Sequence, residues 1–374
     1  MRVKLEDVCE RGSSNIKQSD IIKMSGNYPI YGASGLAGKV NFYHQEQPYV
    51  AVVKDGAGIG RTTLNPAKSS VIGTMQYLIP KKNVLPEYLF YVVSYMHLEK
   101  YYTGATIPHI YFKDYKNEEF NLDNIEKQLE IIDVLGRCKK VIEARKQELV
   151  ELDSLTKARF VELFGDPVAN PMHWPVKRLK ELAIQINSGN TPKGGSENYV
   201  EKGITFFRSQ NVWKDRLEMD DIAYIDEKTH ESMKRSSLKH GDILMTKTGR
   251  INTENSSLGR AALYEGEDDM ANVNGHVYFI RLKEGVNNKF VLRVLVSPEY
   301  RDLIRSVCVG GIDKRQLNKE HIEEFPIIYP PSEMIDNYIE FVEQVNKSKF
   351  DTMTFAPIYA IINLYLHTYF YQGR

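Results

Sequence analysis

The sequence lacks the features that mark secreted and disulfide-rich proteins. Its only three cysteines, Cys9, Cys138 and Cys308, lie far apart and form no CxxC pair. Neither a disulfide framework nor a zinc site is therefore expected. The N-terminal MRVKLEDVCERG has no apolar run after its charges, which argues against a secretory signal peptide. We expect a protein of the reducing cytoplasm.

Surplus charge and catalytic motifs are missing too. The 49 basic residues balance the 49 acidic ones, so the overall charge predicts no nucleic-acid partner. No GxSxG, no HExxH and no methyltransferase-like or nuclease-like cluster occurs. His109, His173, His230 and His276 have no cysteine or carboxylate nearby at ligand spacing. The sequence therefore predicts a noncatalytic chain that holds no metal and no cofactor of its own.

An internal repeat is present instead. Four sequence segments from the first third of the chain have similar counterparts in the second half, in the same order, which is not expected by chance. The matched pairs are Val3–Val8 with Val176–Leu182, Val52–Arg61 with Met245–Arg260, Ile72–Pro80 with Val273–Leu282, and Gly104–Phe120 with Gly310–Ile327. A chain of 374 residues is long enough for two cores. We expect two similar mixed domains, at residues 1–121 and 166–329.

The local patterns of the first domain indicate both strands and helices. Pro48–Gly56 and Ser69–Pro80 are β-branched runs bounded by turn residues, which is typical of strands. Pro86–Tyr102 has a helical pattern with proline at its start. The expected fold class is therefore α+β.

The longest uninterrupted pattern is helical and runs from Asn124 to Phe164. Its apolar residues recur at alternating steps of three and four, as in a seam that another helix covers. They are Ile131, Leu135, Cys138, Ile142, Leu149, Leu152 and Leu163, interrupted by the polar Arg145 and Arg159. At 1.5 Å per residue such a helix would be roughly 60 Å long. We interpret residues 122–165 as a spacer helix between the two domains.

A second helix is predicted after the second domain, at residues 330–350. There Ile339, Val342 and Val345 take the places of Ile132, Leu135 and Cys138. The two helices would form antiparallel coiled-coil rods, and the domains would be related by an approximate twofold axis. The residues predicted for this helix interface are Leu135, Ile142, Leu149, Leu152, Ile339, Val342 and Val345.

The tail, residues 351–374, loses this periodicity. It contains Pro357 and no charged residue between its two ends. An apolar span of this length can be a membrane anchor, but Pro357, Asn363, His367 and several tyrosines dilute that interpretation. The alternatives are a helical hairpin or irregular segment lying on the first helix, and a C-terminus altered by recombination or frameshift. The sequence leaves these three alternatives open.

A glycine-rich loop, Gly56 to Gly60, follows a predicted strand. Its GxGxG spacing fits neither the dinucleotide fingerprint nor the P-loop, so it could be a simple tight turn. Alternatively, its glycines let the backbone approach a phosphate while Lys54 and Arg61 supply charge. The repeat favours this second interpretation, because Lys247, Gly249, Arg250 and Arg260 place the same residue types in the corresponding loop.

Other loops mix arginine, lysine, asparagine, glutamine and tyrosine with glycine. Arginine with guanine, and asparagine or glutamine with adenine, are the pairs that read base edges in the major groove. The simpler alternative for each residue is an ordinary solvated loop. The candidate DNA-binding residues are Tyr31, Lys39, Lys54, Arg61 and His109 in the first domain, and Arg208, Asn211, Lys247, Arg250, Arg260, His276, Lys314 and Arg315 in the second.

The repeat, the junction FGDPVANPMHWPVKRL after the long helix, and the domain endings EEF and EEFPIIYPPSE resemble the specificity subunit of type I restriction-modification systems. The resemblance covers residues 1 to about 350. It implies two target recognition domains, each reading one half of a split sequence in double-stranded DNA, and helices that set the gap between the halves. It also implies two modification subunits docked on the helices and restriction subunits outside them. S-adenosylmethionine, ATP and magnesium would belong to those partners.

The sequence departs from this family where a second full-length helix should continue after Phe350. Two other functions therefore stay open. One is a coiled-coil scaffold that joins proteins without contacting DNA. The other is a recombined allele that folds but does not assemble.

Overall fold

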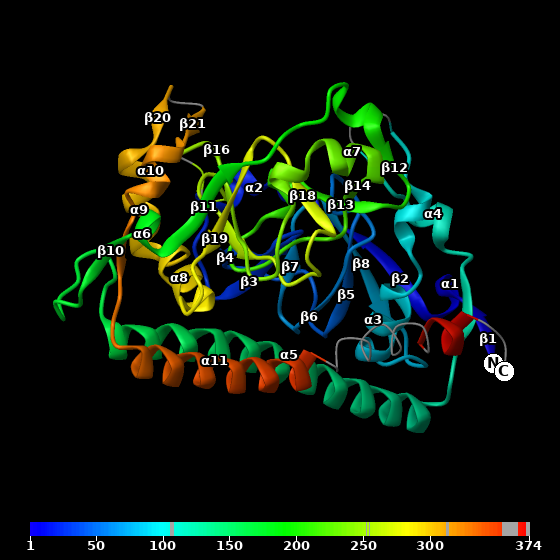
Figure 1. Cartoon of the computed structure of the whole chain (residues 1–374). Helices are drawn as coiled ribbons and strands as arrows, with labels where there is room; N and C mark the ends of the chain where they lie inside the picture. The colour runs from blue at the N-terminus through cyan, green and yellow to red at the C-terminus, as the bar shows by residue number, and fades with distance from the viewer. Residues whose placement is uncertain (105–107, 252, 254, 312–313, 354–365, 372–374) are drawn as a thin grey trace. The chain divides into compact units, whose positions relative to one another are not determined.

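The computed structural model describes the chain except residues 105–107, 252, 254, 312–313, 354–365 and 372–374, and except the side chains of 351–353. The described chain forms two compact units (Figure 1). Unit 1 comprises Met1–Val150 and Phe350–Arg374, and unit 2 comprises Glu151–Lys349.

Unit 1 is built around a four-stranded antiparallel sheet in the order β2-β8-β5-β6. All five residues of β5 are buried, as expected for an apolar β-branched run in the centre of a sheet. A second sheet has the order β4-β3-β7, and β1 pairs with β9. The elements are β1 (Arg2–Lys4), α1 (Leu5–Val8), β2 (Cys9–Ser13), α2 (Gln18–Ile21), β3 (Tyr28–Gly32), β4 (Gly35–Val40), β5 (Tyr49–Val53), β6 (Thr62–Asn65), β7 (Ser70–Val71), β8 (Met75–Pro80), α3 (Pro86–Ser94), α4 (Phe112–Tyr115) and β9 (Glu119–Asn121).

Unit 2 repeats this topology. Its four-stranded sheet β11-β19-β15-β17 matches β2-β8-β5-β6, and the pair β10-β22 matches β1-β9. The parallel pair β13-β18 likewise matches β3-β7. The first elements are β10 (Val176–Arg178), α6 (Leu179–Leu182), β11 (Ala183–Ser188), β12 (Tyr199–Val200), β13 (Ile204–Phe207), β14 (Ala223–Ile225), α7 (Glu227–Ser232), β15 (Ile243–Thr246) and β16 (Thr248–Gly249). The remaining elements are β17 (Ala261–Leu263), β18 (Ala271–Val273), β19 (Val277–Leu282), α8 (Asn288–Leu295), α9 (Pro298–Val307), β20 (Val309–Gly310), β21 (Arg315–Gln316), α10 (Lys319–Glu323), β22 (Pro326–Ile328) and α11 (Ser332–Met353). The predicted repeat and the α+β class are confirmed.

One predicted helix is shorter than its sequence pattern. The pattern extended to Tyr102, but α3 ends at Ser94 and a separate 3₁₀ turn covers Leu98–Tyr101. Between them His97 has a φ of 52°, in the left-handed region, and a helix cannot continue through that backbone conformation.

The long helix predicted within residues 122–165 is present as α5 (Ile125–Phe164), a single helix of 40 residues, and its role as a spacer stays a prediction. Asn124 precedes it, and its side-chain oxygen accepts a hydrogen bond from the amide of Lys127 at 2.9 Å. This contact satisfies one of the amides that every helix N-terminus leaves unpaired. The two arginines that interrupt the apolar pattern form ion pairs on the helix surface, Arg145 with Glu148 and Arg159 with Glu162.

In unit 2, α11 packs antiparallel to the end of α5. Tyr338 of α11 makes T-shaped ring contacts with Phe160 and Phe164 at centroid distances of 5.6 and 5.5 Å. Further along, Lys349 forms an ion pair with Asp153 at 2.6 Å. Phe290 of α8 completes the aromatic cluster, 5.1 Å from Phe164. The helix pair is thus part of the core of unit 2 (Figure 1).

The predicted helix-interface residues face the interior of their own units to different degrees. Leu135 belongs to the core of unit 1, and Ile339 to the core of unit 2 with Val342 packed against it. Val345 is buried as well. Ile142, Leu149 and Leu152 are only half-buried.

The described end of the tail, residues 366–371, is helical and belongs to the core of unit 1. Leu366 and Phe370 are buried, and the Phe370 ring makes a T-shaped contact with Tyr88 of α3 at 5.5 Å. The side-chain amide of Asn121 donates to the carbonyl of Tyr369 at 3.0 Å. This part of the tail thus lies beside the start of α5, while the predicted features at residues 354–365, Pro357 included, lie outside the described residues.

The sequence of this segment resembles the end of α5 in one respect. Leu366 and Phe370 repeat the four-residue spacing of Phe160 and Phe164. In the part of the chain that the structure describes, no helix combines the length and the apolar character needed to cross a membrane.

Replacing Phe370 by leucine is expected to destabilise unit 1 by about 1 kcal/mol, because the edge-to-face contact with Tyr88 is lost while most of the volume is kept. Amide hydrogen exchange of α3, followed by mass spectrometry, measures the loss. Phe350→Leu is the matched control, since its ring is 69% exposed. Equal protection of α3 in both variants would contradict the docking of residues 366–371.

Candidate nucleic-acid interface

In unit 1, three of the predicted residues meet at the loop that follows β5. Asp55 connects two of them, since its Oδ1 lies 2.7 Å from Nδ1 of His109 and its Oδ2 lies 3.9 Å from Nζ of Lys54. Arg61, at the end of the same loop, donates from Nη1 to the carbonyl of Ala33 at 3.1 Å. The loop therefore presents Lys54, Arg61 and His109 from one braced surface.

The glycine-rich loop is a tight turn. Gly56 and Gly60 have φ values of 93° and 80°, which glycine adopts without strain. The amide of Gly56 donates to the carbonyl of Pro108 at 3.0 Å, and that of Gly60 to Val53 at 2.9 Å. These two amides are used within the protein. Phosphate binding by this loop stays a prediction that rests on Lys54 and Arg61.

The other two predicted residues of unit 1 lie on the β3-β4 hairpin. Tyr31 in β3 is half-buried against the cluster that contains Tyr49 and Tyr77. Lys39 in β4 is exposed, opposite Pro29. No described contact joins Lys39 to the loop of Lys54.

In unit 2, a small sheet of order β16-β21-β20 gathers four predicted residues. The amide of Lys247 donates to the carbonyl of His276 at 2.8 Å, and the carbonyl of Lys247 accepts from Leu317 at 2.9 Å. Arg250 and Lys314 are exposed and line one hollow of about 330 Å³ together with Thr248 and Asn255. Arg250 and Lys314 thus share one polar hollow, while Lys247, which directly precedes β16, is joined to His276 through its backbone.

The two units build this surface in the same way. In unit 1, His109 bridges to Asp55 on one side and to Thr103 on the other. In unit 2, Arg315 pairs in the same manner with Gly249 and Gly310. His109 and Arg315 therefore occupy corresponding positions, which the alignment of the repeat had suggested.

Three predicted residues of unit 2 are used mainly inside the protein. Asn211 is 1% exposed, and its side-chain amide donates to the carbonyls of Glu218 and Asp221 at 3.0 Å each. Arg208 is largely covered and forms an ion pair with Asp221 at 3.1 Å. Arg260 is 8% exposed, and its Nε donates to the carbonyl of Ser256 at 2.9 Å. These three side chains brace loops, and direct base contact by them stays an untested prediction.

No sequence pattern pointed directly to the acidic partners of these loops. Asp55 holds His109, and Asp221 holds the loop of Arg208. Hydrogen bonds from Gln210 and Arg208 lower the pKa of the Asp221 carboxyl below its usual value, so it is ionised at neutral pH. The available clue for Asp55 was an aspartate at the end of the predicted strand Pro48–Gly56, next to the basic candidate Lys54. Among the described residues, no group of three or more histidine, cysteine or acidic side chains could hold a metal ion.

With two matching units and their loops established, comparison with known proteins defines the class. The sequence profile of the family described as "Type I restriction modification DNA specificity domain" matches residues 1–153 and 171–354. The chain belongs to this family. The two matched segments correspond to the two repeats. The DNA-specificity subunits of this family are noncatalytic, and the chain is therefore not one of the enzyme subunits.

One relative is the type I restriction enzyme MjaIX specificity subunit of Methanocaldococcus jannaschii, 26% identical over 287 residues that cover 71% of this chain. The match spans 63% of that relative's length. The crystal structure of the S subunit of a type I restriction-modification system from M. genitalium matches 99% of this chain and 95% of its own, with a TM-score of 0.60 and 15% identity. A chain from a structure titled for the complex assembly and conformational transition of the type I system matches 98% of this chain and 94% of its own length, with a TM-score of 0.53 and 15% identity. At this identity the two structures show a shared fold.

Proposed function

We propose that this chain is the DNA-specificity subunit of a type I restriction-modification complex, and that each unit reads one half of a split target in double-stranded DNA. The observation that carries the proposal is the matched pair of basic loop surfaces in a chain of the specificity family. Lys54, Arg61 and His109 would contact DNA from unit 1. Arg250 and Lys314 would do so from unit 2.

Within each surface, exposed and braced residues have different roles. Arg250 and Lys314 are exposed on a polar hollow and can reach base edges or phosphates. Arg208, Asn211 and Arg260 help to fix the loops around them, since Asn211 and Arg260 donate to backbone carbonyls and Arg208 pairs with Asp221. A rigid loop presents its contacts at lower entropic cost.

The catalytic steps would belong to partner subunits. We propose that modification subunits dock on the helices and that restriction subunits assemble outside them, with two modification subunits per chain. S-adenosylmethionine, ATP and magnesium would bind to these partners. In support, α5 exposes Val134, Val141 and Leu155, which are spaced seven and fourteen residues apart, with Glu148 at the position between the last two, and are about half exposed. Such spacing suits a partner helix.

Replacing Arg250 by alanine is expected to relax one position of the target and to weaken specific binding by about 1–3 kcal/mol, because one base contact is lost. The assembled complex carrying the variant is tested by genome-wide methylated-base mapping and by DNA affinity. Arg235→Ala is the matched control, since Arg235 is also exposed in unit 2 but lies outside this hollow. An unchanged methylation motif and an unchanged affinity in Arg250→Ala would contradict the assignment.

The same experiment separates the alternative functions. A coiled-coil scaffold would give an assembled complex whose DNA binding shows no sequence dependence and little salt dependence. A non-assembling allele would not co-purify with the modification subunit. The contact of residues 366–371 with the core of unit 1 favours an intact tail over an altered one.

A further inference from the structure

Unit 2 contains a second basic site, distinct from the loop surface around Arg250. It is a cavity of about 660 Å³ between α5, α8, α9, α11 and the loops that precede β17 and follow Trp213. Eight basic and three acidic side chains line it. Such an excess of one charge around a cavity favours a bound ion of the opposite sign.

The three acidic side chains do not neutralise the eight basic side chains that line the cavity. Asp153 forms an ion pair with Lys349 at 2.6 Å, and Asp302 with Arg305 at 3.2 Å. Asp215 has no ion pair within the described part of the chain. Desolvation raises the pKa of its carboxyl, and Arg293 and Lys349 act in the opposite direction. Even with all three carboxylates ionised, the wall keeps a net positive charge.

Arg260 supplies a fixed cation in this wall. Its guanidinium stacks on the Trp213 ring at 3.9 Å and is held by the carbonyls of Ser256 and Asn255. No carboxylate among the described residues pairs with it. Burial, Arg301 and Arg216 all lower the pKa of Arg260, because three cations that share a small region disfavour one another's charge. An anion between them would relieve this repulsion.

Two further groups point to an anion. The Nε of Arg293 is buried and has no hydrogen-bond partner within the described structure. A buried unpaired donor on a charged side chain costs free energy unless a ligand accepts its hydrogen bond. The N-terminus of α9 also borders the cavity through Ser297 and Pro298. Its helix dipole places partial positive charge there.

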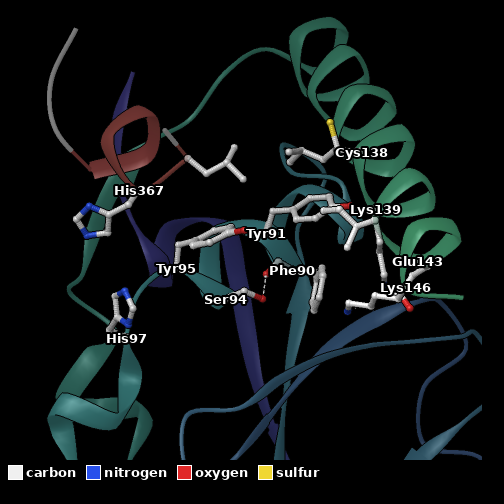
Figure 2. A pocket seen from close by; sticks show the side chains of 13 residues that line it. Phe90, Tyr91, Ser94, Tyr95, His97, Cys138, Lys139, Glu143, Lys146 and His367 are labelled. Carbon is white, nitrogen blue, oxygen red and sulfur yellow. Dashed lines mark hydrogen bonds and ion pairs between the residues drawn. The ribbon is translucent and has the colours of Figure 1, made fainter. Parts of the chain in front are cut away.

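The internal repeat shows that the fold does not require these cations. Unit 1 has a cavity of about 770 Å³ in the corresponding place, between α3 and α5 (Figure 2). Its wall is mostly apolar, and its charged side chains are two lysines and one glutamate, against eight basic and three acidic ones in unit 2. Tyr88 and Phe290 are the buried third residues of α3 and α8, so Tyr91 in unit 1 corresponds to Arg293 in unit 2. The same helix arrangement folds around tyrosine in one copy and arginine in the other. Packing of the fold therefore does not explain the basic lining, whereas binding of an anionic ligand does.

We propose that the cavity lined by Arg260, Arg293 and Lys157 binds a phosphate group. Planar guanidinium groups and helix N-termini are the donors that phosphate oxygens prefer. The phosphate can come from a free phosphoanion or from the backbone of bound DNA. Only the second source rests on the proposed function.

The test uses the full chain with inorganic pyrophosphate as the probe, measured by isothermal titration calorimetry. The unsubstituted chain is expected to bind it. Arg293→Gln and Lys157→Gln are expected to bind at least tenfold more weakly, by removing one cation each. Lys289→Gln is the control, because Lys289 lies on α8 outside the cavity and pairs with Glu343. If Arg293→Gln fails to fold, Lys157→Gln still tests the site, since Lys157 is exposed on α5.

A second arm identifies the source of the phosphate. The assembled complex is titrated with duplex DNA at several salt concentrations. If a backbone phosphate occupies the cavity, each variant reduces the slope of log affinity against log salt by about 1. If a free phosphoanion is the ligand, the two variants bind pyrophosphate more weakly, but the slope of log DNA affinity against log salt is the same as for the unsubstituted chain.

Two results would overturn the proposal. One is a chain that binds no pyrophosphate and whose variants leave the DNA slope unchanged. The other is a loss of co-purification with partner subunits without either effect, which would assign the cavity to an acidic protein surface. Pyrophosphate binding in a complex that shows no sequence-dependent DNA binding would leave the site intact and refute the proposed function instead.

Discussion

Replacing Phe164 by alanine is expected to destabilise unit 2 by about 3–5 kcal/mol, the usual range for removing a buried phenylalanine side chain. Phe164 is fully buried at the end of α5, within 5.1 to 5.5 Å of the rings of Phe160, Phe290 and Tyr338. Removing it leaves a cavity where α5, α8 and α11 meet. The loss would weaken the docking of α11 and the domain core together, since both share this cluster.

Urea unfolding followed by tryptophan fluorescence measures this loss selectively. Both tryptophans of the chain, Trp174 and Trp213, lie in unit 2, so the signal reports on that unit. Val161→Ala is the control on the same helix, because Val161 is 54% exposed and its truncation should change stability by about 0.5 kcal/mol or less. A loss below about 1 kcal/mol for Phe164→Ala would show that this cluster does not hold α5 in place.

Replacing Arg281 by methionine is expected to cost about 3–5 kcal/mol, because it leaves a buried carboxylate without its cation. Asp242 is 1% exposed, and Arg281 contacts both of its oxygens, from Nε at 2.9 Å and from Nη2 at 2.7 Å. The amide of Lys239 donates to the same carboxylate at 2.8 Å. Arg281 also donates to the carbonyl of Ser237, so the pair joins β19 to the turn before β15.

This loss should depend on pH. Desolvation raises the pKa of Asp242, and Arg281 opposes that rise, so the pKa in Arg281→Met should be higher still. A carboxyl whose folded pKa exceeds its unfolded value costs stability as pH rises through those values. The destabilisation by Arg281→Met should therefore be largest at neutral pH and shrink as the pH falls.

Urea unfolding between about pH 4 and pH 7, read by the same fluorescence, checks this expectation. The double variant Arg281→Met with Asp242→Asn should be less destabilised at neutral pH than Arg281→Met alone, because no buried charge remains. Arg216→Met removes an exposed ion pair with Glu218 and should cost about 1 kcal/mol or less. A pH-independent loss in Arg281→Met would refute the role assigned to the buried charge.

The fold could be predicted where the chain repeats itself. The helix α5 follows from a long apolar register without proline, and β5 follows from five consecutive apolar residues. The early end of α3 could not be predicted, because the residues after Ser94 keep a helical pattern while His97 adopts a left-handed conformation. That conformation depends on contacts that the local sequence does not encode.

The site could be predicted only in part. The repeat identified the loops of Lys54 and Arg250, and the structure places both at basic surfaces. Residue type alone did not separate exposed arginines from those that hold loops together. Arg260 and Arg208 donate to backbone carbonyls that only the folded chain brings near them.

The tail could also be predicted only in part. Its loss of heptad periodicity suggested that the second helical stretch stops near Phe350, and α11 is described as far as Met353. The spacing of Leu366 and Phe370, the same as that of Phe160 and Phe164, was the clue that the described end would return to a core. A heptad pattern does not reveal this segment, because only Leu366 and Phe370 of its six residues are buried.

The contribution of residues 366–371 to unit 1 has a consequence for how the chain is made. Unit 1 consists of two stretches of sequence with all of unit 2 between them. At about 5–20 residues per second, a ribosome needs roughly 10–40 s to synthesise unit 2. Throughout that interval Phe370 has not been synthesised, so Tyr88 lacks this contact and the core of unit 1 is incomplete. Unit 1 therefore cannot complete its core until all of unit 2 has been synthesised.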